Sequence, residues 1–205
     1  MAIISNAVTM IDAGAVSASL GSMTLIKTLT ASNSANLSFV HGASSVVLDG
    51  TYPIYLFKFF DIHPSVDNRD FQVNVSIDSG SNYNVAKTTN YHYNYRGESG
   101  TGTGVEYIGG ASLHQETGFQ EIMENVGGDN DQSGSGEMYL FSPASTTFIK
   151  HFIARMTHYS ANNYNKHGYM SGYANTTSAV NAVQFKMAAD NIQTGTIKLY
   201  GIKDS

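Results

Sequence analysis

The chain consists mainly of short segments in which apolar and polar residues alternate. The clearest is the segment 71–77, where phenylalanine, valine and isoleucine alternate with glutamine, asparagine and serine. A period of two residues predicts a half-buried antiparallel strand. Further segments rich in Val, Ile, Thr, Tyr and Phe are bounded by turn residues, which is the pattern of strands. The sequence therefore predicts strands over residues 23–29, 36–40, 52–62, 71–77, 90–95, 137–141, 147–159, 169–173, 182–187 and 196–202.

The segment 52–62 departs from this alternation because it is almost continuously apolar. Such a run is typical of a central strand that is covered on both faces. Gly-, Ser- and Asn-rich stretches predict the loops, and only residues 112–125 have a loosely helical pattern. We therefore predict an all-β fold, an antiparallel β-sandwich that is jelly-roll-like, with at most one short helix.

The chain has 205 residues, which suits one β-sandwich domain. Residues 1–22 are predicted as an N-terminal arm that docks on another surface, and residues 23–205 as the single β-sandwich domain. A first edge strand of the same domain is the alternative for the N-terminal segment, since termini are ordered only where they are tied down.

Charged residues are scarce in this chain. They make up 13% of the residues, and the formal net charge is −5. Without a basic stripe to neutralise phosphates, we expect no nucleic-acid partner. Cysteine is absent, which excludes disulfides and Cys-ligated zinc, and no apolar run reaches the length of a membrane-spanning helix. We expect no membrane partner and no cofactor.

The sequence contains none of the hydrolase or phosphate-binding signatures GxSxG, HExxH or GxxxxGK[ST]. The glycine-rich stretch 100–104 is predicted as a flexible surface loop, because no helix or lysine follows it. A Ser–His–Asp triad stays open, since its members need not be neighbours in sequence. We expect a non-enzymatic protein without catalytic residues.

One loop has oxygen ligands at the spacing of a calcium-binding loop. Asp129, Asp131 and Ser133 match its first half, but Leu140 stands where the bidentate glutamate should be. The loop is therefore a weak calcium candidate. The alternative is a solvated turn whose side chains bond their own backbone.

Tyrosine is common, with 13 residues, and it clusters beside amides. Tyr91, Tyr93 and Tyr95 share one face of a predicted strand, and Tyr159 and Tyr164 flank two asparagines. Such rings and amides can stack on and hydrogen-bond a glycan. They can equally pack in a protein interface, where Tyr is enriched.

Several blocks in fixed order resemble a family of virion structural proteins of marine tailed phages, those of cyanobacteria and pelagic bacteria. The matching blocks are residues 22–28, 51–59 with 62–64, 79–84, 136–143 with 145–151, 172–179, 183–187 and the final GTIKLYG strand at 195–201. At 189–192 the chain has Ala-Asp-Asn-Ile where the family usually has a Ser-Gly-Asn-Ile turn. The family has no catalytic motif to carry over.

The resemblance implies a structural protein in the virion, assembled in the host cytoplasm. The expected role is an exterior capsid decoration, cement or head-fibre protein that contacts other virion proteins. By analogy it would be a homo-oligomer, with a trimer as the common arrangement. The alternative is a tail-fibre or adhesin domain that binds host-surface glycans. A hydrolase is a third hypothesis, but no pair of carboxylates stands out for it.

Overall fold

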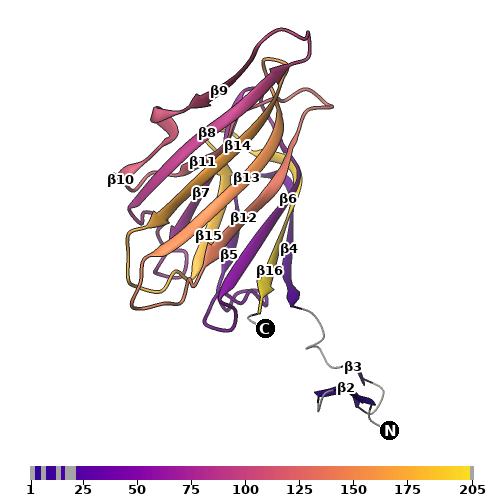
Figure 1. The fold of residues 1–205 in the computed structure, drawn as a ribbon, viewed down its shortest axis with the longest axis vertical. Helices are drawn as coiled ribbons and strands as arrows, with labels where there is room; N and C mark the ends of the chain where they lie inside the picture. Colours follow the sequence, from indigo (N-terminus) through magenta and orange to yellow (C-terminus); the bar gives the residue numbers. More distant parts are fainter. Residues whose placement is uncertain (1–2, 6–7, 13–14, 17–21, 204–205) are drawn as a thin grey trace.

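The computed structural model describes residues 3–5, 8–12, 15–16 and 22–203, and nearly all of its regular structure is β (Figure 1). The strands are β1 Ile3–Ser5, β2 Val8–Asp12, β3 Ala15–Val16, β4 Met23–Ser34, β5 Leu37–Val40, β6 Ile54–Pro64, β7 Arg69–Ser76, β8 Lys87–Gly97, β9 Thr103–Tyr107, β10 His114–Glu116, β11 Gln120–Val126, β12 Gly134–Phe141, β13 Lys150–Ser160, β14 Tyr164–Ala174, β15 Ala182–Met187 and β16 Ile192–Ile202. A 3₁₀ turn, η1, spans Gly109–Ala111.

The strands from β4 onward form one antiparallel sheet that folds into two layers (Figure 1). The larger layer has the order β4-β16-β6-β12-β13-β14-β8, and β9 and β10 both pair with β8. The smaller layer has the order β11-β7-β15-β5. A single residue pair, Val126 with Ser160, joins β11 to β13 and connects the two layers. The predicted all-β antiparallel sandwich is confirmed.

The N-terminal strands β1, β2 and β3 pair antiparallel with one another in a separate sheet. Much of the predicted arm over residues 1–22 lies outside the described residues. The predicted boundary at residue 23 coincides with the first residue of β4.

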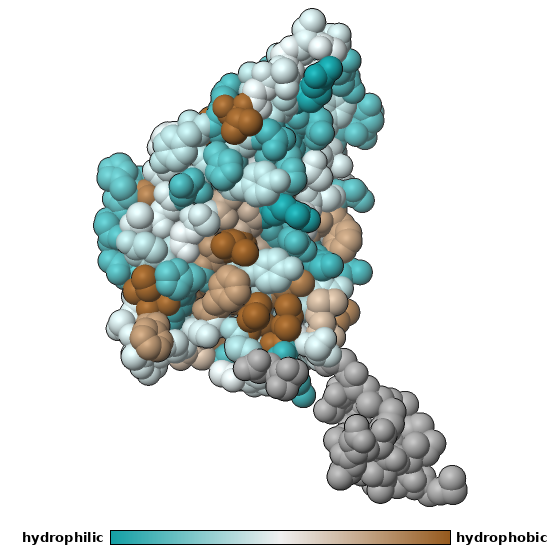
Figure 2. Space-filling view, viewed as in Figure 1, coloured by the Kyte–Doolittle hydropathy of each residue, from teal (hydrophilic) through white to brown (hydrophobic). Residues whose placement is uncertain are grey.

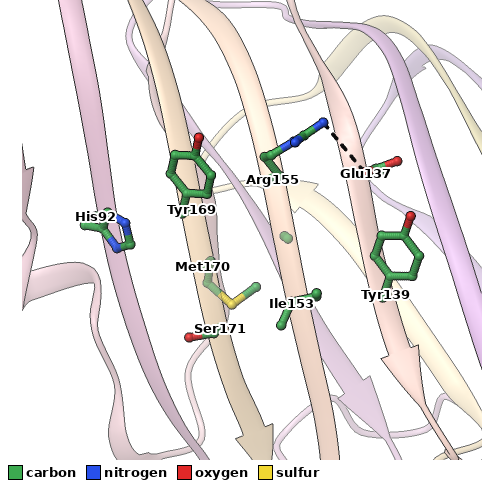
Figure 3. A pocket seen from close by; sticks show the side chains of 9 residues that line it. His92, Glu137, Tyr139, Ile153, Arg155, Tyr169, Met170 and Ser171 are labelled. Carbon is green, nitrogen blue, oxygen red and sulfur yellow. Dashed lines mark ion pairs between the residues drawn. The ribbon is translucent and has the colours of Figure 1, made fainter.

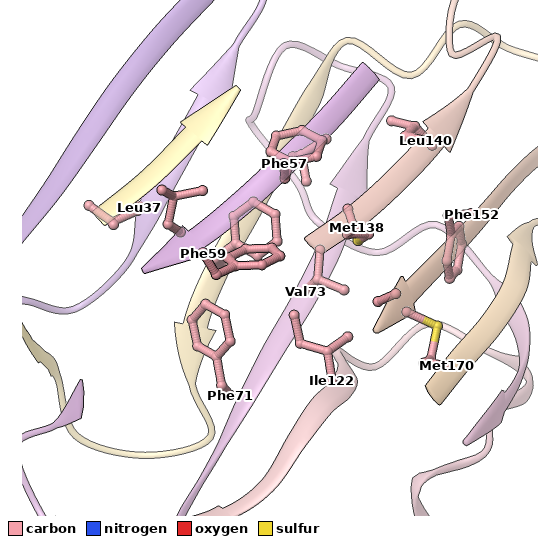
Figure 4. Packing of buried hydrophobic residues seen from close by; sticks show 14 of the residues in the cluster. Leu37, Phe57, Phe59, Phe71, Val73, Ile122, Met138, Leu140, Phe152 and Met170 are labelled. Carbon is pink, nitrogen blue, oxygen red and sulfur yellow. The ribbon is translucent and has the colours of Figure 1, made fainter. Parts of the chain in front are cut away.

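Aromatic rings from both layers meet in the core (Figure 4). Phe185 of β15 lies 5.2 Å from Phe57 and 5.1 Å from Phe59, both of β6, measured between ring centroids. Phe39 of β5 and Phe71 of β7 complete the cluster, and all five rings are at most 1% exposed. The apolar segment 52–62 thus supplies the centre of the core, but it is not covered on both faces as predicted, since Phe60 is 41% exposed.

Residues 112–125, where the pattern is loosely helical and at most a short helix was expected, contain no helix. These residues form β10 and β11, and the only helical turn among the described residues is η1, just before them. Strand β11 contains register shifts, so its side chains do not alternate regularly between faces. The apolar residues of β11 therefore do not recur at every second position, as they do in a regular strand.

Strand β7 also differs from its prediction, because both of its faces are covered. Asn74 and Ser76, on the predicted polar face, are completely buried. The Asn74 amide donates hydrogen bonds to the carbonyl oxygens of Tyr83 at 2.7 Å and Thr117 at 3.0 Å. The loop that follows β7 and a more distant loop at Thr117 thus cover this face and satisfy the Asn74 amide.

Candidate functional site

The tyrosines predicted on one strand face do line the inner face of β8. The ring centroids of Tyr91 and Tyr93 lie 6.2 Å apart, and those of Tyr93 and Tyr95 lie 6.1 Å apart. Exposure rises along the row, from 0% for Tyr91 and 6% for Tyr93 to a half-buried Tyr95. Tyr91 belongs to the core of the chain itself, so the prediction that it contacts a glycan or another subunit is wrong. Alternation alone cannot show which face of a strand is the inner one.

The outer end of this row opens into a pocket of about 210 Å³, which we call the tyrosine pocket. Its residues come from β8, β9, β11, β14 and the turn between β13 and β14. They are Tyr93, Tyr95, Glu106, Glu124, Asn125, Asn162, Tyr164 and Lys166. The structure thus brings together three of the predicted tyrosines, Tyr93, Tyr95 and Tyr164. Tyr159 does not line the pocket, and its hydroxyl donates to Glu98 Oε2 at 2.6 Å.

Glu106 lies at the mouth of the tyrosine pocket. It stands directly opposite Tyr93 in the ladder of β8 and β9, and the Tyr93 hydroxyl donates to its Oε2 at 3.1 Å. The carboxylate of Glu106 also raises the pKa of Tyr95. Burial raises the pKa of Tyr93, and the negative charge of Glu124 adds to this. Both hydroxyls therefore stay protonated at neutral pH and can donate hydrogen bonds.

A buried ion pair forms the inner wall of the tyrosine pocket. Lys166 Nζ lies 2.7 Å from Glu124 Oε2, and the Lys166 side chain is only 5% exposed. The same ammonium lies 4.3 Å from the centroid of the Tyr93 ring, a cation–π contact. Because Lys166 neutralises Glu124, the uncompensated charge of the pocket is that of Glu106.

Two glycines of the stretch 100–104, which was predicted as a loop, make room for the aromatic walls. A Cβ added to Gly104 would lie 2.9 Å from Cε1 of Tyr95. Gly102 has a φ of +75°, and a Cβ there would lie 2.8 Å from Cε1 of Tyr164. These rings lie 5.3 Å apart in an edge-to-face arrangement. The glycine-rich composition that predicts a flexible loop thus also reflects close contact with Tyr95 and Tyr164.

Sequence patterns missed the polar half of the tyrosine pocket. Glu106 lies on β9, and Glu124 and Asn125 lie on β11, two strands that were not predicted. Asn125 also has a left-handed backbone with a φ of +56°, beside a register shift of β11. The one available signal was the presence of charged residues in a chain that has few of them.

A second concave surface lies on the outer face of the larger layer (Figure 3). This outer groove has a volume of about 350 Å³ and follows β13. Tyr139 of β12 and Tyr169 of β14 stand on either side of Ile153 (Figure 3). The rings of His92 and Tyr169 stack at 5.4 Å with an interplanar angle of 13°.

Cross-strand pairing places charged and aromatic side chains in one row across the outer face. Lys58 pairs with Glu137, and Glu137 pairs with Arg155. The row continues from Arg155 to Tyr169 and then to His92. The ion pair of Arg155 with Glu137 is loose, at 4.0 Å, and Arg155 is largely exposed. In the space-filling view this face is a mixture of polar and apolar side chains (Figure 2).

The predicted calcium loop brings only part of its ligand set together. Asp131 and Ser133 line a pocket of about 390 Å³ with Asp61, whereas Asp129 is not among its lining residues. The backbone N–H of Asp129 instead donates to Oε1 of Gln132 at 3.1 Å. In the described part of the chain, no group of three or more His, Asp or Glu side chains is arranged to hold a metal ion. A calcium ion at this loop stays a prediction.

The described residues include no helix with the length and apolar character needed to cross a membrane. No family model, no curated protein and no solved structure matches this chain.

Proposed function

We propose that this chain is a non-enzymatic structural protein of a tailed-phage particle, held on other virion proteins through the outer face of its larger layer. The sequence blocks that resemble marine phage virion proteins motivate the particle. The main support for this docking surface is the outer groove with its row of aromatic and charged side chains. The expected role is that of an exterior decoration, cement or head-fibre protein.

The chemistry of this face suits a protein partner. Ile153 is 46% exposed at the base of the outer groove, so a partner side chain inserted between Tyr139 and Tyr169 would remove apolar surface from water. Tyr and Arg are enriched at the energetic centres of protein interfaces. Arg155 lies beside this apolar base and can pair with a carboxylate or a carbonyl group of the partner.

Copy number tests the role in the particle. Quantitative mass spectrometry of purified virions, with the major capsid protein as reference, should find the chain at a stoichiometry that follows the capsid lattice. A few copies per particle would instead support the tail-fibre alternative. Absence of the chain from purified virions would overturn the proposed function.

A matched pair of variants tests the docking face. Ile153→Asp places a charge in the outer groove, whereas Ile77→Asp places the same charge at a similarly exposed position, 41%, just after β7. We expect Ile153→Asp to reduce binding of the purified chain to particles that lack it by about tenfold or more. Ile77→Asp should bind as the unaltered chain does. Equal binding of all three proteins would show that the partner lies elsewhere.

A further inference from the structure

We propose that the tyrosine pocket binds a single neutral or amino-substituted pyranose unit of a surface polysaccharide. This site lies on the inner side of β8 and β14, whereas the outer groove lies on the opposite face of the same layer. The proposal is independent of whether the chain is part of a virion. It concerns a different set of residues from those of the docking face.

The size and the composition of the pocket favour one sugar ring. Its volume of about 210 Å³ is below the range of about 300–1,000 Å³ that is usual for drug-sized ligands. The rings of Tyr95 and Tyr164 are half-buried, and the surface that the pocket exposes is mainly polar, which suits the hydroxyl groups of a pyranose. The amides of Asn125 and Asn162 and the carboxylate of Glu106 surround these rings with hydrogen-bonding groups. Amides both donate and accept, as paired sugar hydroxyls require.

The charges in the pocket select against anionic sugars. The one ammonium group, Lys166, is already bound to Glu124 and lies over Tyr93. It is also nearly buried, whereas Glu106 is exposed at the mouth. A uronate or a sulfated sugar would therefore bring its charge against the free carboxylate of Glu106, which costs free energy. A neutral sugar has no such cost, and an ammonium group on the sugar would pair with Glu106.

The walls of the pocket are fixed before any ligand arrives. The Tyr93 hydroxyl is bonded to Glu106, and the Glu124–Lys166 ion pair holds β11 against β14. The turn that contains Asn162 is tied to the β8–β9 hairpin, because the N–H of Glu98 donates to the carbonyl of Asn163 at 3.1 Å. Preorganised groups lose little conformational entropy on binding, which favours recognition of a small ligand.

Saturation-transfer NMR of the full chain with methyl pyranosides tests the proposal. The probes are the methyl glycosides of glucose, galactose, N-acetylglucosamine and glucosamine, and methyl glucuronide is the anionic control. We expect at least one of the first four to bind, and we expect the glucuronide to bind at least about tenfold more weakly than that sugar. Binding of none of the four, or tightest binding of the glucuronide, would overturn the proposal.

Two pairs of variants locate the bound sugar. Asn162→Ala and Glu106→Gln alter exposed side chains of the pocket, so both proteins should fold. The controls are Asn94→Ala on the outer face of β8 and Glu116→Gln on β10, both exposed. We expect each pocket variant to weaken binding about fivefold or more, because Asn162→Ala removes a hydrogen-bonding amide and Glu106→Gln replaces a charged acceptor with a weaker neutral one. The controls should have no effect.

Unchanged binding in both pocket variants would overturn the assignment of the site. The sugar-binding test and the docking test can fail independently of each other. Loss of sugar binding with normal attachment to particles affects only the tyrosine pocket, whereas loss of attachment with normal sugar binding affects only the proposed function.

Discussion

Lys166 and Glu124 form an ion pair across the interior, between β14 of the larger layer and β11 of the smaller one. Their 2.7 Å contact is withdrawn from solvent, with side chains that are 5% and 19% exposed. An ion in such a place costs free energy unless a partner compensates it. The pair therefore holds the two layers together where few ladder hydrogen bonds connect β11 to β13.

Replacing Lys166 by methionine should destabilise the fold by about 3 kcal/mol, because Glu124 would remain partly buried without its partner. The measurement is the free energy of unfolding from urea titration. Arg155→Met is the matched control, since the Arg155–Glu137 pair is 4.0 Å long and largely exposed. Its loss should cost at most about 1 kcal/mol. Similar losses for the two variants would contradict a special role for the interior pair.

Phe185→Ala should cost about 4 kcal/mol, because this ring packs against four other phenylalanines from both layers. Phe148→Ala makes the same chemical change at a side chain that is 72% exposed, and it should alter stability by no more than about 0.5 kcal/mol. Chemical denaturation of both variants provides the comparison. A loss below about 2 kcal/mol for Phe185→Ala would mean that the core can collapse around the missing ring.

Gly104→Ala should lower the melting temperature by about 3 °C, because the added methyl group meets the ring of Tyr95. The ring must move, so the near-ultraviolet circular dichroism of the tyrosines should change as well. Gly110→Ala is the control, since a Cβ at Gly110 meets nothing within 4 Å. An unchanged melting temperature and spectrum for Gly104→Ala would show that Tyr95 has free space behind it.

Stability should depend on pH through buried His158 and half-buried Glu121, which act in opposite directions. Burial lowers the pKa of His158 from 6.5 to about 4. Above pH 6.5 the imidazole is neutral in both states, and as the pH falls from 6.5 toward 4 the unfolded state gains a proton first, so the free energy of unfolding decreases. Burial, with Asp70 and Glu124 nearby, raises the pKa of Glu121 from 4.5 to about 7. Glu121 therefore destabilises the fold as the pH rises from 4.5 to 7.

Comparison of each variant with the unaltered chain should isolate the titration of the residue that was replaced. The stability of Glu121→Gln relative to the unaltered chain should increase as the pH rises from 4.5 to 7, with a slope of up to about 1.4 kcal/mol per pH unit. The stability of His158→Gln relative to the unaltered chain should increase as the pH falls from 6.5 to 4. Urea titrations across this range measure both differences. Two differences that change in the same direction with pH would be incompatible with the assigned shifts.

From β4 onward, the amino-acid pattern predicted ten strands and missed β9, β10 and β11. In β7, β13 and β16 successive side chains point to opposite faces of the sheet, so apolar residues recur at a period of two residues that is visible in the sequence. The continuous apolar run of β6 is equally visible. The strand β11 was missed because its register shifts break that period. The strand β9 was missed because Thr103–Tyr107 has no buried face, with Val105 75% exposed.

The sequence by itself determined that the chain is all-β and that Tyr91, Tyr93 and Tyr95 share a face. Only the tertiary structure decided that this face points inward and opens at one end into a pocket with Glu106, Glu124 and Lys166. The physical reason is the range of the interactions. Strand formation and side-chain alternation depend on neighbours along the chain, whereas the pocket depends on contacts between β8, β9, β11 and β14, which span residues 87–174 of the sequence.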